Sequence, residues 1–129
     1  MIVADFRIIM NGYEYLMKFL KEEGFRMNEE ETYFSFKYQG NNFVAFKNDG
    51  PFLQIVMVCN TRDYARNQLL EVCNTMNDNK FIIKFVVNDP NVWCSYEFKP
   101  NKDITSDDFD TIFLQLDKAT DELYEKLSK

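Results

Sequence analysis

Histidine is missing from this sequence of 129 residues. Its absence removes the commonest general base, the commonest metal ligand and every Ser–His or Cys–His nucleophile pair. Glycine is scarce as well, at four residues, and no glycine-rich phosphate-binding loop is present. A carboxylate mechanism is the enzymatic chemistry that remains. We therefore expect a protein that is not an enzyme and that has no catalytic residues, no cofactor and no metal site.

Cysteine is limited to Cys59, Cys73 and Cys94, an odd number at wide spacing. No disulfide framework or zinc signature fits this pattern, and each residue lies in an apolar run, where a free cysteine behaves as a small hydrophobic residue. No apolar run approaches the roughly 20 residues of a membrane span. The N-terminal "MIVADFRIIMNGY" lacks the small-residue cleavage site of a signal peptide. We expect a cytoplasmic protein with no membrane partner.

Basic residues are in deficit, because 15 Lys and Arg stand against 21 Asp and Glu, for a formal net charge of −6. Much of the excess lies in residues 103–129, which hold eight acids and three lysines. Non-specific affinity for nucleic acid requires a basic face that neutralises phosphates, so we expect no nucleic-acid partner. Apolar residues are plentiful: they make up 46% of the chain and include 13 Phe and 7 Tyr. This composition predicts one domain over residues 1–129 with an aromatic core.

The first helix is indicated by apolar residues with the spacing i, i+3, i+4 and i+7. They are Phe6, Ile9, Met10, Tyr13, Leu16, Met17 and Leu20. Gly24 suits the position just after the end of this helix. The periodicity favours a start near Ala4, which places Gly12 in the helix interior at a cost of about 1 kcal/mol. The alternative is a start near Gly12, with Asn11 and Glu14 as a capping pair.

Five strands are predicted by alternating or continuous apolar runs that are separated by turn residues. They cover residues 34–38, 43–47, 52–59, 81–87 and 92–99, and the turns are "QGNN", "NDGP" and "NDPN". The acidic run 29–31 before the first strand is interpreted as a solvated loop.

Two further helices complete the order. The second helix presents Ala65, Leu69, Val72, Cys73 and Met76 on one face. Thr61 or Asn60 is expected to cap it, and residues 77–79 are expected to end it. Thr105 or Ser106 is expected to cap the last helix. The order α-β-β-β-α-β-β-α predicts an α+β, two-layer fold, in which a five-stranded antiparallel sheet has its helices on one face.

Three groups of residues are candidates for a binding site. Arg62 and Arg66 are predicted to lie one helical turn apart, where they could bind an anion. Asn74 and Asn77 share a face near the end of the second helix, where they would either bond to nearby backbone or hold an extended peptide. The third group is Phe34, Phe36 and Tyr38, which crowd the first strands together with Phe43 and Phe46. If helices do not cover all of these aromatic rings, the remainder would form an apolar interface.

The segment from "LLEVCNTMNDNKFIIKF" to "DKATDELYEKL", with its Asn-x-x-Asn pattern at Asn74 and Asn77, resembles the second half of the YbjN family. Members of that family are described as proposed bacterial sensory transduction regulators. A strand pair and a hydrophobic-Thr entry at Ile104-Thr105 lead into the long last helix, as in the family. "FLKEEGF" and the strands after it extend the resemblance over residues 13–127.

The resemblance implies the fold of type III secretion chaperones, which often form homodimers and bind an extended segment of a partner. It supplies no catalytic residues. We therefore expect a non-enzymatic protein- or peptide-binding module, chaperone-like or regulatory, that forms a homodimer and has an unidentified partner. The alternative is a sensor for a small molecule or an anion, bound in a cleft between helix and sheet, with Arg62 and Arg66 as its candidate residues.

Overall fold

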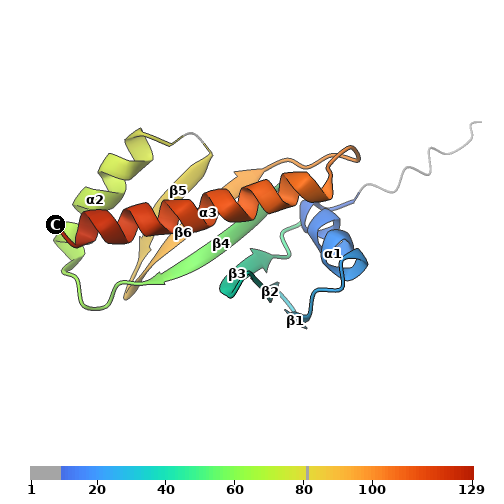
Figure 1. Cartoon of the computed structure of the whole chain (residues 1–129), viewed down its shortest axis with the longest axis horizontal. Coiled ribbons are helices and arrows are strands. Elements are labelled where there is room, and N and C mark those ends of the chain that lie inside the picture. The colour runs from blue at the N-terminus through green and yellow to red at the C-terminus, as the bar shows by residue number, and fades with distance from the viewer. Residues whose placement is uncertain (1–9, 81) are drawn as a thin grey trace, which may run out of the picture.

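The computed structural model describes residues 10–80 and 82–129. Its elements in chain order are α1 (Gly12–Glu22), β1 (Met27–Glu29), β2 (Tyr33–Tyr38), β3 (Asn41–Phe46), β4 (Leu53–Asn60), α2 (Arg66–Asp78), β5 (Ile83–Asn88), β6 (Asn91–Phe98) and α3 (Ser106–Leu127). The strands form one six-stranded sheet in the order β1-β2-β3-β4-β6-β5, and every neighbouring pair is antiparallel (Figure 1). The fold is α+β, as predicted.

The predicted five strands and their order are wrong by one strand, because β1 precedes β2 and pairs with it. Glu29, which was assigned to a solvated loop, lies in β1 opposite Phe34. Its carboxylate accepts a hydrogen bond from Lys47 Nζ at 2.8 Å, and this contact lowers the pKa of Glu29. A short exposed strand that is held by main-chain bonds and one ion pair has no apolar alternation for a sequence pattern to detect.

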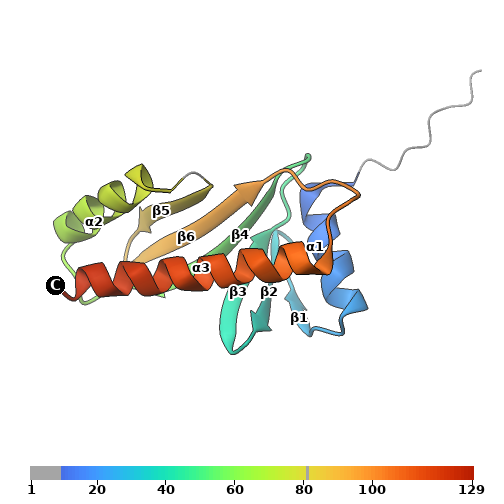
Figure 2. The ribbon, with the colours of Figure 1, turned by 45° about the horizontal axis from the view of Figure 1, so that its top comes forward.

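The three helices within the described residues pack on the same face of the sheet, where their apolar residues share one core with the strands. The strand residues in the hydrophobic core alternate along each strand, as one-sided burial requires. They are Phe34, Phe36, Phe43, Ala45, Leu53, Ile55, Met57, Cys59, Phe85, Val92 and Cys94. The long helix α3 crosses this face, with α2 and α1 near its two ends (Figure 2). The predicted placement of the helices on one face is therefore correct.

Phe113 of α3 is the centre of the aromatic core. Its ring centroid lies 4.8 Å from that of Tyr38, 5.1 Å from that of Phe43 and 5.3 Å from that of Phe36. Phe34 is completely buried. Phe34 and Phe36 are buried in the core, because α3 covers the face of β2 and β3 on which they lie, so these two rings cannot hold a peptide. Tyr38 is partly buried beside Phe113, and Phe46 lies on the opposite face of the sheet, where it stacks on Trp93.

Helix α1 begins at Gly12, not near Ala4, and residues 4–9 of the predicted longer helix lie outside the described residues. Asn11 is extended, with φ −65° and ψ 151°, and its N–H donates to Glu14 Oε1 at 2.9 Å. Its Oδ1 accepts a hydrogen bond from the Gly50 N–H at 3.0 Å, and the Gly12 N–H donates to Gly50 O at 2.9 Å. These bonds join the start of α1 to the loop that precedes β4.

The predicted N-terminal cap of α2 is wrong, and that of α3 is correct. Helix α2 begins at Arg66 after an extended Ala65, so neither Thr61 nor Asn60 caps it. Thr61 is instead buried, and its hydroxyl donates to the Pro90 carbonyl at 3.0 Å. Helix α3 begins as predicted: Thr105 Oγ1 accepts from the Asp108 N–H at 3.2 Å, and Asp108 Oδ2 accepts from the Thr105 N–H at 2.9 Å.

The close approach at Gly12 yields the first testable prediction. A Cβ atom on Gly12 would lie 2.5 Å from the carbonyl carbon of Phe52 and 2.7 Å from the Leu53 nitrogen, and both of these atoms are backbone. We expect Gly12→Ala to lower the free energy of unfolding by about 1–3 kcal/mol, the usual effect of overpacking, in urea denaturation. A glycine in the interior of a longer helix would give the opposite sign, a gain of about 1 kcal/mol. Unchanged or increased stability would contradict the close contact.

Candidate functional site

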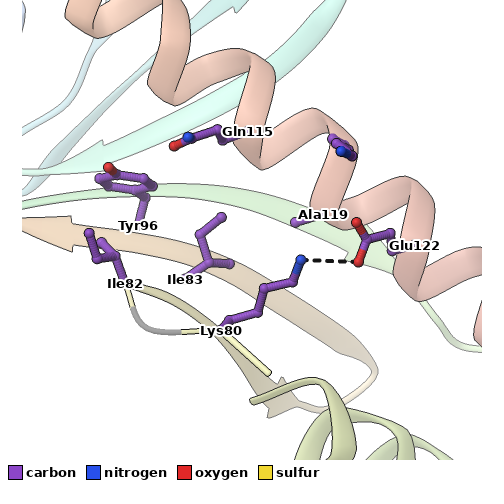
Figure 3. A pocket seen from close by; sticks show the side chains of 8 residues that line it. Lys80, Ile82, Ile83, Tyr96, Gln115, Ala119 and Glu122 are labelled. Carbon is purple, nitrogen blue, oxygen red and sulfur yellow. Dashed lines mark ion pairs between the residues drawn. The ribbon is translucent and has the colours of Figure 1, made fainter. Parts of the chain in front are cut away.

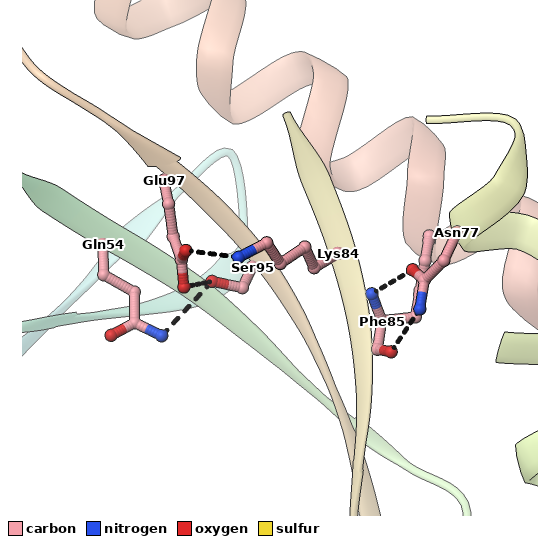
Figure 4. Close-up of polar contacts among 6 residues, drawn as sticks. All are labelled: Gln54, Asn77, Lys84, Phe85, Ser95 and Glu97. Carbon is pink, nitrogen blue, oxygen red and sulfur yellow. Dashed lines mark hydrogen bonds and ion pairs between the residues drawn. The ribbon is translucent and has the colours of Figure 1, made fainter. Parts of the chain in front are cut away.

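Asn77 joins the end of α2 to the edge strand β5. Its Nδ2 donates to the Phe85 carbonyl at 3.0 Å, and its Oδ1 accepts from the Phe85 N–H at 2.7 Å (Figure 4). In an antiparallel ladder both polar groups of one residue point to the same side, so those of Phe85 point away from β6. The Asn77 amide therefore takes the place that a further strand would occupy at this residue. The predicted bonding of Asn77 to nearby backbone is confirmed.

Asn74 behaves differently from Asn77. Its side chain is exposed, so the prediction that it is at least half buried is wrong. One turn of α2 separates the two asparagines, and only the position nearer the helix end faces the β5 backbone. The sequence spacing places both residues near the end of α2. It does not show how α2 is rotated about its own axis, which decides which of the two faces the strand.

The two arginines do not form the predicted pair on one helix. Arg62 lies before α2, in the turn after β4, where its Nε donates to Asn60 Oδ1 at 3.2 Å. Arg66 is the first residue of α2 and forms an ion pair with Asp89 of the β5–β6 turn. The candidate anion site therefore loses its geometric basis, because one of its two cations already has a carboxylate partner.

The three cysteines are buried and free, on β4, α2 and β6. Burial raises the pKa of the Cys59 and Cys73 thiols to about 11, and it raises that of Cys94 as well. The thiols are consequently protonated at neutral pH, and a protonated thiol is a poor nucleophile and metal ligand. Over residues 10–80 and 82–129, no group of three or more His, Cys, Asp and Glu residues is arranged to hold a metal ion.

A groove lies between α3 and the β5–β6 pair. Ile83, Tyr96 and Phe98 line the sheet side of this α3 groove, and all three are partly exposed. Its helix wall includes Ile112, Gln115 and Ala119. Two cavities of about 330 and 480 Å³ both have Tyr96 and Gln115 in their lining, and we call them together the α3 groove. Figure 3 shows the smaller cavity.

The α3 groove lies where the helix passes over the end of the β5–β6 pair. The two strands are paired from Asn88 and Asn91 to Ile83 and Tyr96, and β6 extends to Phe98. Tyr96 and Phe98 meet edge to face, with ring centroids 5.5 Å apart. Partial burial raises the pKa of Tyr96. The sequence predicts a strand over residues 92–99 that includes Tyr96 and Phe98. It carries no local signal for the groove, because the groove depends on the path of α3 over the sheet.

The two ends of the α3 groove differ in charge. At one end Lys80 Nζ lies 3.1 Å from Glu122 Oε2, and Lys118 lines the same cavity (Figure 3). The other end is bounded by Lys99, Asp103 and Asp108, together with the uncharged residues Pro100, Asn101 and Ile104. The walls thus provide polar groups of both signs around an apolar floor, an arrangement typical of pockets that bind organic ligands or side chains.

The sheet face opposite the helices carries a second feature, which we call the sheet patch: Val44, Phe46, Val56, Val58, Val86 and Trp93. Val58, Trp93 and Val86 lie in register across β4, β6 and β5. The Phe46 and Trp93 rings stack at 5.5 Å, and Val56, on the strand between them, is completely buried. Val58 and Val86 are each 48% exposed.

A polar network borders the sheet patch. Gln54 Nε2 donates to Ser95 Oγ at 3.3 Å, and Ser95 Oγ donates to Glu97 Oε1 at 3.3 Å (Figure 4). Lys84 Nζ donates to Glu97 Oε2 at 3.0 Å. The last of these bonds pairs the charges of Lys84 and Glu97 with each other.

Comparison with known proteins gives one informative result. No family model matches the chain, and no curated protein matches it in sequence. A search of solved structures finds the crystal structure of YbjN from E. coli, described as a proposed transcription regulator. It matches with a TM-score of 0.62 over 87% of each chain, at 13% sequence identity. The chain has the fold of YbjN. At this identity the likeness to YbjN concerns the fold alone.

The YbjN fold agrees with the resemblance that the sequence showed around Asn74 and Asn77. No helix in the part of the chain that the structure describes is long and apolar enough to cross a membrane. The bonds at the β5 edge, the α3 groove and the sheet patch are described from this chain's own residues.

The pairing of Asn77 with Phe85 yields the second prediction. Asn77→Leu leaves a backbone donor and acceptor unpaired at the edge of the sheet, so the free energy of unfolding should fall by about 1–3 kcal/mol in urea denaturation. The matched control is Asn74→Leu, the same change one turn earlier on the exposed side of α2. It should change stability by less than about 0.5 kcal/mol. Equal effects of the two substitutions would contradict the structural role of Asn77.

Proposed function

We propose that the chain is a non-enzymatic module that binds an apolar segment of a protein or peptide in the α3 groove. The observation that carries the proposal is the partial exposure of Tyr96 and Phe98 on the face of the sheet that is otherwise covered by helices. Aromatic rings that are partly open to solvent in a groove provide large contact areas for a partner's side chains.

The closed edge of β5 favours groove binding over strand addition. An added strand binds through the free backbone groups of an edge strand. At Phe85 these groups are already bonded to the Asn77 amide. A partner that docks near β5 therefore gains more from apolar side-chain contacts in the α3 groove, and an amphipathic helix or a short extended segment meets that requirement.

Two likenesses support a role in binding proteins. The sequence resembles the YbjN family, and that resemblance implies the fold of type III secretion chaperones, which bind extended segments of their partners. E. coli YbjN is described as a proposed transcription regulator. A regulator that acts through a protein partner needs no basic surface, which suits a chain of net charge −6. A chaperone-like or regulatory role thus rests on the same binding event.

A small organic anion is the second candidate ligand for the α3 groove. Lys80 and Lys118 lie at one end of the groove beside an apolar floor, and Lys80 is paired with Glu122. Native mass spectrometry of the freshly purified chain separates the two candidates. A tightly bound compound of defined small mass would support the sensor role.

The test of peptide binding is a selection of random peptides displayed on phage against the immobilised wild-type chain. Selected peptides should bind Gln115→Arg about tenfold or more weakly, because an arginine at this position of the helix wall fills the groove. Asn74→Arg is the matched control, since it makes the same amide-to-arginine change on an exposed helix surface, and it should bind like wild type. Failure to enrich any peptide, or equal binding by both variants, would refute the proposal.

A further inference from the structure

We infer that the sheet patch is the contact between two copies of this chain, which associate with their uncovered sheet faces opposed. The inference is independent of peptide binding in the α3 groove, because the two surfaces lie on opposite faces of the sheet. Surface chemistry, charge and the bonding at the β5 edge each favour a second copy as the partner.

The surface chemistry of the patch is that of the centre of an interface. Val58, Trp93 and Val86 form one row across three strands, and the two valines are each 48% exposed. The only tryptophan of the chain lies between them. Aromatic residues in a row of exposed aliphatic residues, with a polar border, are typical of surfaces that dock on another protein.

Charge favours a second copy as the occupant. The strand residues that face away from the helices include three charged side chains, Lys37, Lys84 and Glu97. Lys84 and Glu97 are bonded to each other within one chain. Much of the excess of acid that makes the net charge −6 lies in residues 103–129, which include α3 on the opposite side of the sheet. Two copies can therefore approach through their sheet faces with little repulsion, whereas contact through α3 would bring acidic surfaces together.

The Asn77–Phe85 bonds hinder a competing mode of association through β5. Two copies that paired their β5 strands would need the polar backbone groups of Phe85, and Asn77 holds both of them. The edge at the other end of the sheet is β1, which is three residues long and offers few bonds. Short or covered edge strands disfavour edge-to-edge pairing, so the face is the larger surface that remains.

The area of the sheet face determines how tightly two copies are expected to associate. Strands lie about 4.8 Å apart and rise about 3.3 Å per residue, so the area from β2 to β5 measures about 20 by 20 Å, or about 400 Å² per copy. Stable interfaces bury about 800 Å² per partner. Association should therefore be weak and should depend on concentration in the micromolar range or above.

The experiment combines sedimentation velocity with the fluorescence of Trp93 over about 1 to 300 μM, a range chosen for weak interfaces. The weight-average mass should rise from that of a 15.4 kDa monomer towards a dimer, and the Trp93 emission should shift to shorter wavelength in parallel. The double variant Val58→Thr/Val86→Thr keeps β-branched residues in the strands and should remain monomeric over a range at least about tenfold wider.

The matched control is Leu114→Thr, because Leu114 is also 48% exposed but lies on α3. This variant should dimerise like wild type. Gln115→Arg, which fills the groove, should dimerise like wild type too, so a failure of the proposed function leaves this result unaffected. Circular dichroism confirms that each variant is folded. A monomer at every concentration, or dimerisation that is unchanged in the double valine variant, would overturn the inference.

Discussion

The pairing of the Asn77 amide with the Phe85 backbone is the constraint on which the arrangement of surfaces depends. A single side chain satisfies both outward-facing groups of an edge-strand residue, at 2.7 and 3.0 Å. It thereby fixes the end of α2 against β5. Leu69, Cys73 and Met76 of α2 are buried in the same core. With the edge closed at this point, the surfaces open to a partner are the α3 groove on the helix side and the sheet patch on the other side.

The two surfaces arise from the way in which three helices cover a six-stranded sheet. Helix α3 runs across the sheet and buries the aromatic rings of β2 and β3 around Phe113. It leaves Tyr96 and Phe98 partly exposed beside α3. Within residues 10–80 and 82–129, the helices pack on the other face, and Val58 and Val86 of the sheet patch are each 48% exposed. A binding protein can use one surface for its partner and the other for self-association.

The sequence predicted those parts of the fold that have a local signal. The apolar stripe and the Thr105–Asp108 cap of α3 are local features, and both were predicted correctly. Strand β1 was missed because it is formed by pairing with β2 and not by its own pattern. The start of α1 was misplaced because the apolar residues before Gly12 continue the helical period. At the start of the helix Asn11 is extended, and Asn11 and Gly12 bond to Gly50, which is far from them in the sequence.

The candidate site was harder to predict, because a site depends on which face is covered. Phe34, Phe36 and Tyr38 have the composition of a docking surface, and only the position of α3 shows that they belong to the core. The pattern Asn-x-x-Asn did identify a structural position, since Asn77 bonds to the strand that follows it. It did not distinguish Asn77 from Asn74, because that distinction requires knowing how α2 is rotated about its axis.

The most direct test of the closed edge is the hydrogen-exchange rate of the Phe85 amide, measured by NMR. The Asn77 amide replaces a neighbouring strand at this residue, so the Phe85 N–H should be protected to about the same extent as amides within the β5–β6 ladder. The neighbouring outward-facing amide of Val87 provides the comparison within the same strand, and it should exchange faster. Exchange of Phe85 as rapid as that of an exposed edge amide would contradict the account.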